Sequence, residues 1–105
     1  MTDKILNLLS ISAKAGKVKS GSFAAEEAIK NKSALLAIMA EDASDGTKKQ
    51  FTNMTTFYEV QLITYSTKET LGRAIGKDER SIVCTTDESL TKAILEQFSV
   101  RGGSK

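Results

Sequence analysis

The amino-acid sequence predicts a single α/β domain in which helices cover both faces of a mixed, largely parallel sheet. Helix patterns and strand patterns alternate along almost the whole chain, which favours neighbouring strands with helices packed on either face. The expected strands include continuous apolar runs such as residues 35–40, as is typical of strands buried on both faces. The 105 residues contain no linker, repeat or low-complexity segment, so we expect one domain.

The first third of the chain predicts two helices joined by a short extended piece. Residues 3–14 carry apolar side chains at helical spacing, and Gly16 follows as the residue that ends this helix. Residues 17–19 are the extended piece, and residues 22–31 predict the second helix. The side chains expected to face the interior are Ile5, Leu8, Leu9 and Ala13 of the first helix and Ala25, Ala28 and Ile29 of the second.

The middle of the chain predicts a strand at residues 35–40, then a helix, then a second strand at residues 60–65. Asp42 and Asp45 lie between a strand and a helix, so we interpret them as capping residues rather than as a catalytic pair of carboxylates. The third helix is marked by the spacing of Thr47, Phe51, Met54, Thr55 and Tyr58.

The last part of the chain predicts a short helix, a third buried strand at residues 81–86 and a terminal helix. Ser66 is expected to cap the short helix in a capping box with Glu69, three residues further on. Gly72 is expected to allow close packing, and Gly76 is expected to end the helix. Asp87 is expected to cap the terminal helix, whose inner side chains are Leu90, Ala93, Ile94, Gln97 and Phe98.

The composition argues against several kinds of chemistry. The chain has no histidine, which removes the commonest general base and metal ligand, and a single cysteine leaves too few soft ligands for zinc. Cys84 lies in the middle of a predicted buried strand, so we interpret it as a structural thiol rather than a nucleophile. We therefore expect no catalytic residues, no metal site and no cofactor.

The same composition predicts a cytoplasmic protein. A lone cysteine cannot form an internal disulfide, which fits a reducing compartment. No apolar run approaches the roughly 20 residues of a membrane span. Residues 1–6 lack the charged and apolar regions of a signal peptide, so we expect none.

The strongest functional signal lies at residues 15–22, where two glycines bracket two lysines just before the second helix. The first turn of a helix offers backbone N–H groups without internal partners, and the macrodipole adds partial positive charge there. Gly21 lets another backbone come close, while Lys17 and Lys19 supply mobile charge. The net charge is only +2, but five lysines fall between residues 14 and 32. This stretch is therefore predicted to hold RNA.

The order and spacing of four segments strengthen this prediction. They are residues 15–21 of the stretch just described and residues 38–44, 47–49 and 71–80. Together they resemble the family of kink-turn-binding ribosomal proteins, and the resemblance extends from Ile5 to about Ile94. It implies a three-layer α/β/α sandwich with a small mixed central sheet, and RNA binding without catalysis. In that family the helix after the glycine matching Gly21 docks into the major groove of a kink-turn, a sharply bent RNA with tandem sheared G·A pairs. The loop matching residues 75–80 covers the bend and can pack apolar groups on an extruded base.

The chain departs from that family at the start of the second helix. The polar residues with which better-studied members touch the G·A bases are replaced here by Phe23 and Ala24, and a lysine often found nearby is Glu27. Contacts from the backbone and from lysines remain available, with lower specificity. Phe23 has two interpretations: it stacks on a base, or it closes the core between helix and sheet, which we favour slightly.

These observations define the expected partners and site. We expect a monomer that binds structured RNA, ribosomal or other, and does not bind membranes. The alternative is a protein-interaction module on the same fold, because the loss of polar residues at positions 23, 24 and 27 leaves an apolar patch. We expect a kink-turn-binding ribosomal-protein-like domain at residues 1–100 and a flexible tail at residues 101–105. The expected RNA-contacting residues are Lys14, Lys17, Lys19, Gly21, Ser22, Phe23, Lys48, Arg73, Ile75, Lys77 and Arg80.

Overall fold

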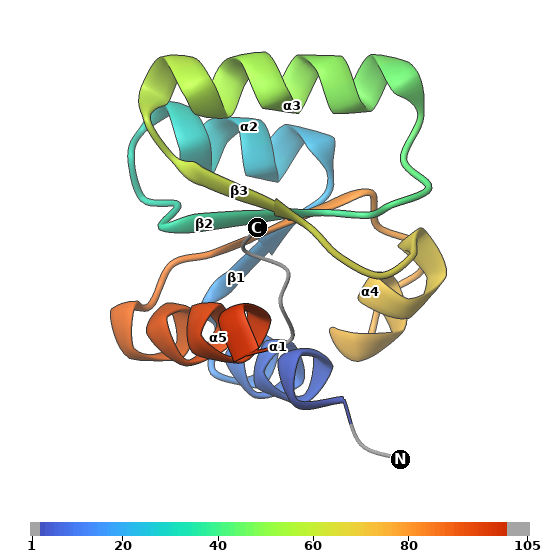
Figure 1. Ribbon diagram of the computed structural model, residues 1–105, viewed down its shortest axis with the longest axis vertical. Helices are drawn as coiled ribbons and strands as arrows, with labels where there is room; N and C mark the ends of the chain where they lie inside the picture. The colour runs from blue at the N-terminus through green and yellow to red at the C-terminus, as the bar shows by residue number, and fades with distance from the viewer. Residues whose placement is uncertain (1–2, 101–105) are drawn as a thin grey trace.

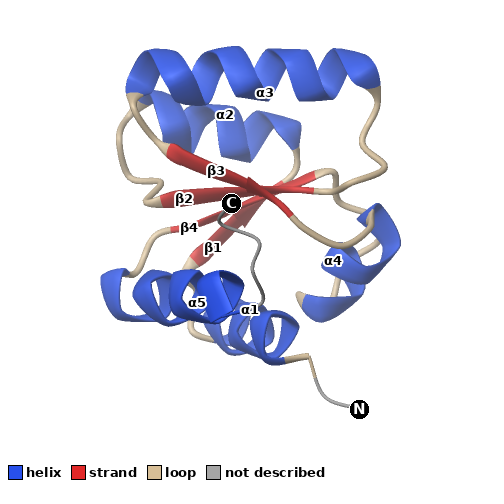
Figure 2. Ribbon diagram, viewed as in Figure 1, coloured by secondary structure: helices blue, strands red, loops and turns tan. Residues whose placement is uncertain are grey.

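The computed structural model describes residues 3–100, in which a four-stranded sheet lies between two layers of helices (Figure 1). Figure 2 shows α2 and α3 on one face of the sheet, α1 and α5 on the other, and α4 at one end. The helices are α1 (Lys4–Lys14), α2 (Ser22–Lys30), α3 (Asp45–Tyr58), α4 (Lys68–Ala74) and α5 (Glu88–Val100). The strands are β1 (Val18–Ser20), β2 (Leu36–Met39), β3 (Gln61–Thr64) and β4 (Ile82–Thr85). The expected three-layer sandwich is confirmed, whereas the tail expected at residues 101–105 lies outside the described residues.

The strand order is β1-β4-β2-β3, and the sheet is mixed, as predicted. β1, β2 and β3 run in the same direction, but β4 lies antiparallel between β1 and β2, so only the β2–β3 pair is parallel. Three of the four strands run in the same direction, as a largely parallel sheet requires. Two of the three strand pairs are antiparallel, however, so the expectation of largely parallel pairing is wrong. The reason is that α4, with seven residues, stays at the end of the sheet instead of crossing a face, so the chain enters β4 from the end at which β3 finishes (Figure 1).

Two apolar cores fill the spaces above and below the sheet. Successive side chains of a strand point to opposite faces, and β2 follows this rule, with all four of its residues buried. Leu36 and Ile38 join the core beneath α1, α4 and α5, whereas Ala37 and Met39 join the core beneath α2 and α3. Burial on both faces explains why this strand reads as an unbroken apolar run in the sequence.

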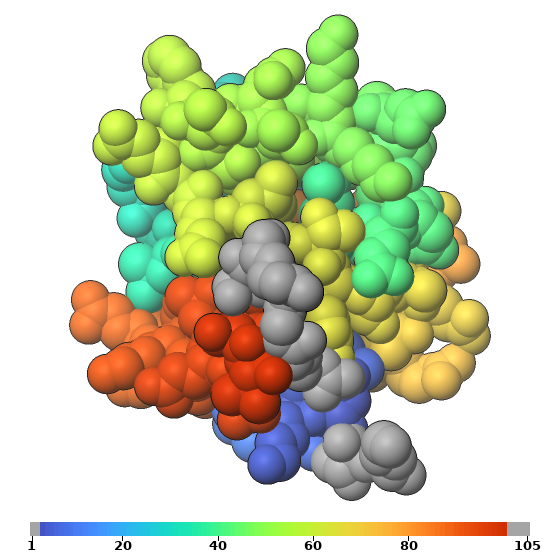
Figure 3. Space-filling model, in the orientation of Figure 1, coloured from blue at the N-terminus to red at the C-terminus, as the bar shows by residue number. Residues whose placement is uncertain are grey.

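The edge strand β3 is only partly covered. Gln61 and Thr64 are exposed, and Figure 3 shows this strand at the surface between α3 and α5. β1, at the opposite edge, has three residues and carries the exposed Lys19, and short, charged edges of this kind resist pairing with other chains.

The predicted cap of α5 is confirmed, whereas the cap of α3 is Ser44 rather than Asp42 or Asp45, and the cap of α4 also differs from the prediction. Asp3, Ser44 and Asp87 cap α1, α3 and α5 with their side chains. The cap of α4 is Thr67 rather than Ser66, because Ser66 has φ 63° and turns the chain after β3. The Ser66 carbonyl instead accepts a hydrogen bond from the Glu41 N–H (2.7 Å).

Candidate nucleic-acid interface

One end of the sheet brings together three segments that are distant in sequence. Because β1, β2 and β3 point the same way, the start of α2, the turn after β2 and the loop that enters β4 lie at this end, on the right in Figure 1. The Gly21 N–H donates to the Ile82 carbonyl (3.1 Å), and the Ala40 N–H donates to the Ser81 carbonyl (2.9 Å). We call this place the α2 edge and define it as residues 19–24, 41–45 and 78–81.

Gly21 begins α2 in a backbone conformation that requires glycine. Its φ of 89° and ψ of 158° fall in a region that other residues almost never occupy. Space is not the constraint, because a Cβ at this position would meet no atom closer than the Arg80 Nε, at 4.0 Å. Glycine is therefore needed to turn the chain from β1 into α2, and it leaves the approach to the helix start open.

The start of α2 differs from every other helix start in residues 3–100. α1, α3, α4 and α5 each receive a side-chain cap, from Asp3, Ser44, Thr67 and Asp87 respectively. Gly21 provides no side-chain cap to α2, and the first turn of α2 contains no acidic residue. Within the described part of the chain, the N–H groups of residues 22–24 have no hydrogen-bond acceptor. These donors point outward at the positive end of the helix dipole.

The loop that enters β4 holds the cation of Arg80 beside these donors. The Arg80 Nε donates to the Ser20 Oγ (3.3 Å), and its Nη1 donates to the carbonyls of Asp78 (3.3 Å) and Glu79 (2.9 Å). Gly72 sets the position of the loop, because a Cβ there would lie 2.0 Å from the Asp78 carbonyl oxygen. The close packing predicted for Gly72 is thus confirmed.

The turn after β2 uses its polar side chains for structure. Asp42 Oδ1 accepts a hydrogen bond from the Lys68 N–H (2.8 Å), so this carboxylate supports the start of α4, and Ser44 caps α3. The prediction that Asp42 caps the helix that follows it is wrong, because its carboxylate turns to the start of α4 and Ser44 takes the cap of α3. Asp45 is the first residue of α3, where the helix dipole stabilises a carboxylate.

The predicted contact residues do not form one cluster. Gly21, Ser22, Phe23, Lys19 and Arg80 lie at the α2 edge. Lys17 precedes β1 and its carbonyl accepts from the Thr86 N–H (3.0 Å), which places it at the far end of the strand. Lys48 lies half-buried in the first turn of α3. Lys14, Arg73, Ile75 and Lys77 surround a separate pocket, described below.

Phe23 lies on the surface and not in the core. Its side chain is 80% exposed, in the first turn of α2, so the interpretation that it closes the core is wrong. The inner positions of α2 are taken by Ala25, Ala28 and Ile29, as predicted, and Phe23 falls outside this stripe. An exposed aromatic ring therefore stands beside the uncapped N–H groups.

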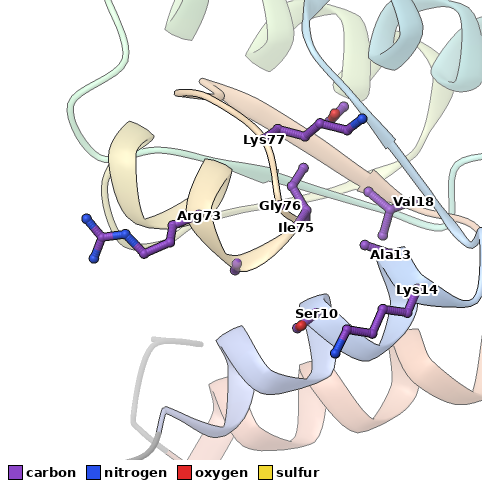
Figure 4. A pocket seen from close by; sticks show the side chains of 10 residues that line it. Ser10, Ala13, Lys14, Val18, Arg73, Ile75, Gly76 and Lys77 are labelled. Atoms are coloured by element: carbon purple, nitrogen blue, oxygen red, sulfur yellow. The ribbon is translucent and has the colours of Figure 1, made fainter.

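The separate pocket lies between the end of α1, strand β1 and the end of α4. It has a volume of about 620 Å³ and is lined by Ser10, Ala13, Lys14, Val18, Ser20, Arg73, Ala74, Ile75, Gly76 and Lys77. We call it the α1–α4 pocket, and Figure 4 shows its side chains. Ile75 is only 9% exposed and belongs mainly to the core beneath it. Val18 and Ser20 were missed in the sequence, although their alternation along β1 places them on one face.

The thiol of Cys84 is not reactive in the folded protein. Cys84 is fully buried, and burial raises the pKa of its thiol to about 12, so it stays protonated at neutral pH. The structural role predicted for Cys84 agrees with this environment. Residues 3–100 contain no cluster of three or more potential metal ligands and no helix long and apolar enough to cross a bilayer.

Comparison with known proteins identifies the family to which this chain belongs. Residues 3–96 match the model of the ribosomal protein L7Ae/L30e/S12e/Gadd45 family, so the chain belongs to that family, as its resemblance indicated. It is similar to the RNA-binding protein YlxQ of Bacillus subtilis strain 168, with 34% identity over 88 residues that cover 84% of this chain and 88% of that protein. It is also similar to the RNA-binding protein YlxQ of Enterococcus faecium, with 30% identity over 95 residues, covering 89% and 92%.

Solved structures agree on the fold. A protein of unknown function from Bacillus halodurans superposes with a TM-score of 0.88 and 28% identity, covering 93% of this chain and 99% of that chain. The Giardia lamblia 15.5kD RNA binding protein superposes with a TM-score of 0.76 and 20% identity, covering 94% and 88%. At that level of identity the second likeness supports the three-layer fold alone.

Proposed function

We propose that this protein is a non-enzymatic RNA-binding protein that holds the backbone of a bent, structured RNA at the α2 edge. The observation that carries the proposal is the uncapped start of α2, whose outward N–H groups have no acceptor within residues 3–100. Membership of the L7Ae/L30e/S12e/Gadd45 family and likeness to two proteins named RNA-binding protein YlxQ support the same proposal.

The chemistry of the edge suits phosphate oxygens. Backbone N–H groups at a helix start bind anions through hydrogen bonds and through the helix dipole, and Gly21 leaves room for a second backbone to approach. Lys19 is exposed on β1 and the Arg80 guanidinium is held beside Ser20 and Gly21, so two cations lie near the donors. The same edge also carries five exposed carboxylates, those of Glu41, Asp42, Asp45, Asp78 and Glu79, so the anion site rests on the N–H groups and these two cations rather than on a net positive charge. Contacts of this kind fix the position of a nucleic acid without reading its sequence.

The preferred ligand in this proposal is a kink-turn, ribosomal or other. A sharp bend brings two stretches of backbone close together, and RNA with splayed bases is recognised largely by shape. At position 23 the chain offers an exposed ring instead of a polar base contact, so a base stacked on Phe23 replaces hydrogen-bonded readout. We infer that shape and stacking, rather than base edges, give this protein its selectivity.

A second candidate function rests on the same residue. Phe23 is 80% exposed beside a half-buried Ala24, and such a ring also suits a protein partner. A protein-interaction module would show no RNA affinity at low salt together with one stoichiometric protein partner. The RNA experiment below therefore separates the two candidates.

The test is fluorescence anisotropy with a kink-turn RNA, compared with the same RNA in which Watson–Crick pairs replace the sheared G·A pairs. We expect the kink-turn to bind at least about tenfold more tightly, with affinity that falls steeply as salt rises. The variant Lys17→Glu/Lys19→Glu is expected to weaken binding severely, and the single variants assign the effect to Lys19 or Lys17. The control is Lys49→Glu/Lys92→Glu, which makes the same charge change on the exposed faces of α3 and α5. Equal loss of binding in both double variants would reject a specific α2 edge.

A further inference from the structure

The α1–α4 pocket has the size and the charge of a small-molecule site. Its volume of about 620 Å³ lies within the range of ligand pockets. Three of its lining residues are cationic, namely Lys14, Arg73 and Lys77, and none is acidic. A concave site lined by one sign of charge concentrates ligands of the opposite sign. The occupant is therefore expected to be an anion.

The two lysines are free to bind such an anion. Within residues 3–100, no hydrogen bond or ion pair engages the Nζ of Lys14 or of Lys77, and both side chains are exposed. Arg73 is different, because its Nη2 pairs with Glu69 Oε2 (2.7 Å) and its guanidinium points away from the other lining side chains in Figure 4. Lys14 and Lys77 come from opposite sides of the pocket, so a ligand that lies along the pocket meets a cation at either end (Figure 4).

The floor between these lysines is apolar. Ala13, Val18 and Ile75 lie there, and Figure 4 shows their side chains between those of Lys14 and Lys77. Hydroxyl groups of Ser10 and Ser20 line the same space and offer hydrogen bonds to a polar ring edge. A lone phosphate or sulfate would fill little of this volume, whereas a flat ring system carrying a phosphate uses the apolar floor, the hydroxyl groups and the cations together.

We propose that the α1–α4 pocket binds a nucleoside phosphate, with the base over Ala13, Val18 and Ile75 and the phosphate at one of the two lysines, Lys14 or Lys77, that border this floor. The site is distinct from the α2 edge, and a free nucleotide needs no kink-turn to bind there. The two places are nevertheless linked, because Ser20 lines the pocket while its Oγ accepts the hydrogen bond from Arg80. The nucleoside phosphate is either free in solution or a nucleotide of an RNA held at the α2 edge.

The first experiment titrates the 15N-labelled protein with adenosine 5′-monophosphate, and separately with inorganic phosphate, and follows the amide spectrum. We expect saturable shifts at Lys14, Val18 and Gly76. We expect adenosine monophosphate to bind at least about tenfold more tightly than phosphate, because only the nucleotide contacts the apolar floor. Shifts centred on residues 22–24, or shifts that do not saturate, would overturn the proposal.

Variants then test the two halves of the pocket. Lys14→Ala/Lys77→Ala is expected to weaken adenosine monophosphate binding at least about tenfold, whereas the matched exposed pair Lys49→Ala/Lys92→Ala leaves it unchanged. Ala13→Leu places a larger side chain on the apolar floor without changing the charge. It is therefore expected to weaken the binding of adenosine monophosphate but not the binding of inorganic phosphate. Unchanged nucleotide affinity in the lysine variant would overturn the proposal, and the amide spectrum checks that each variant is folded.

Competition with RNA identifies the source of the nucleotide. If an RNA nucleotide occupies the pocket, saturating adenosine monophosphate weakens kink-turn binding, and so does Lys14→Ala/Lys77→Ala. If free nucleotide is the ligand, RNA and adenosine monophosphate bind together. Both results support the pocket. A protein that binds adenosine monophosphate in the pocket but binds no RNA would refute the proposed function alone. A protein that binds RNA but not adenosine monophosphate would refute the proposed nucleotide site alone.

Discussion

α2 and α3 begin at the same end of the sheet, after strands that run in the same direction, yet their first turns have opposite character. α3 is capped by Ser44, whose Oγ accepts from the Thr47 N–H (3.2 Å), and Asp45 adds a carboxylate to its first turn. α2 follows Gly21, which has no side chain to cap with, and no acid lies in its first turn. The protein satisfies one helix start with its own side chains and leaves the other available to an external anion.

This difference shows where an anion site is located in a fold with several helix starts. Every helix carries a dipole, so the dipole alone does not distinguish α2 from the rest. The distinction comes from the absence of a competing cap and from the glycine that allows close approach.

The largest effect is expected from Gly72→Ala, which displaces the loop beside α2. The new Cβ would lie 2.0 Å from the Asp78 carbonyl oxygen and 2.6 Å from its carbonyl carbon, and these backbone atoms cannot yield without moving the loop. We expect a loss of about 3 kcal/mol in the free energy of unfolding, measured by urea denaturation. RNA affinity is expected to fall as well, because the loop carries Arg80. An unchanged urea midpoint would show that the loop is not fixed by Gly72.

A smaller effect is expected from Gly21→Ala, with Gly46→Ala as its counterpart in α3. Alanine at position 21 is strained by the positive φ, at a cost of about 2 kcal/mol, and the shifted turn disturbs the donors of α2. Gly46 lies in the first turn of α3, where a Cβ meets no atom within 4 Å, so alanine there is expected to stabilise by up to about 1 kcal/mol. Only the change at position 21 is expected to weaken RNA binding in the anisotropy assay. A loss of binding in the α3 variant would contradict the comparison.

Ser44→Ala removes the cap of α3 and makes its start resemble that of α2. We expect a loss of about 1 kcal/mol in the free energy of unfolding, because the Thr47 N–H loses its acceptor. RNA affinity is expected to stay within about twofold, since an uncapped start without the glycine turn of α2 gives no approach to RNA. A gain in affinity would mean that loss of a cap is sufficient to create an anion site.

The smallest effect is expected from pH acting through the Cys84 thiol, which should leave the free energy of unfolding unchanged near neutral pH. Its folded pKa, raised to about 12 by burial, exceeds its ordinary value of 9.0, so folding favours the protonated thiol. The resulting stability is fully present below pH 9 and is lost as the pH rises from about 9 toward 12. We expect the difference in unfolding free energy between the wild type and Cys84→Ala to be constant from pH 6 to 8 and to shrink above pH 9. A difference that varies between pH 6 and 8 would mean that the thiol ionises in the folded protein near neutral pH.

Most of the fold could be predicted from the sequence because its signals are local. Gly16 and Gly76 end their helices with positive φ, and the apolar run of β2 is buried on both faces, as its pattern indicates. The strand pairing could not be predicted, because it depends on whether α4 crosses a face of the sheet. The cap of α4 was missed for a related reason, since Ser66 is needed to turn the chain after β3.

The site was less predictable because side-chain direction depends on tertiary structure. The sequence identified Gly21 and the start of α2, which follow from residues in one stretch. Phe23 was favoured as a core residue because it is aromatic, but its position on the helix turns it into solvent. Lys14 and Lys77 were grouped with Gly21, although the fold places them around a separate pocket. The lysines and arginines in the sequence indicate that the protein binds a polyanion. They do not indicate how many separate sites these cations form in the fold.

The place of β4 has a consequence for how this chain acquires its structure during synthesis. β4 is the last of these four strands to leave the ribosome, yet it joins β1 to β2, with Val18 paired to Thr85, 67 residues further along the chain. Until that strand has emerged, β2 can pair with β3, but β1 has no partner strand in the sheet and the glycine turn has no Ile82 carbonyl to anchor it. A truncated or stalled chain that ends before residue 82 therefore lacks the assembled binding end, so this protein becomes competent to bind only after β4 has been synthesised.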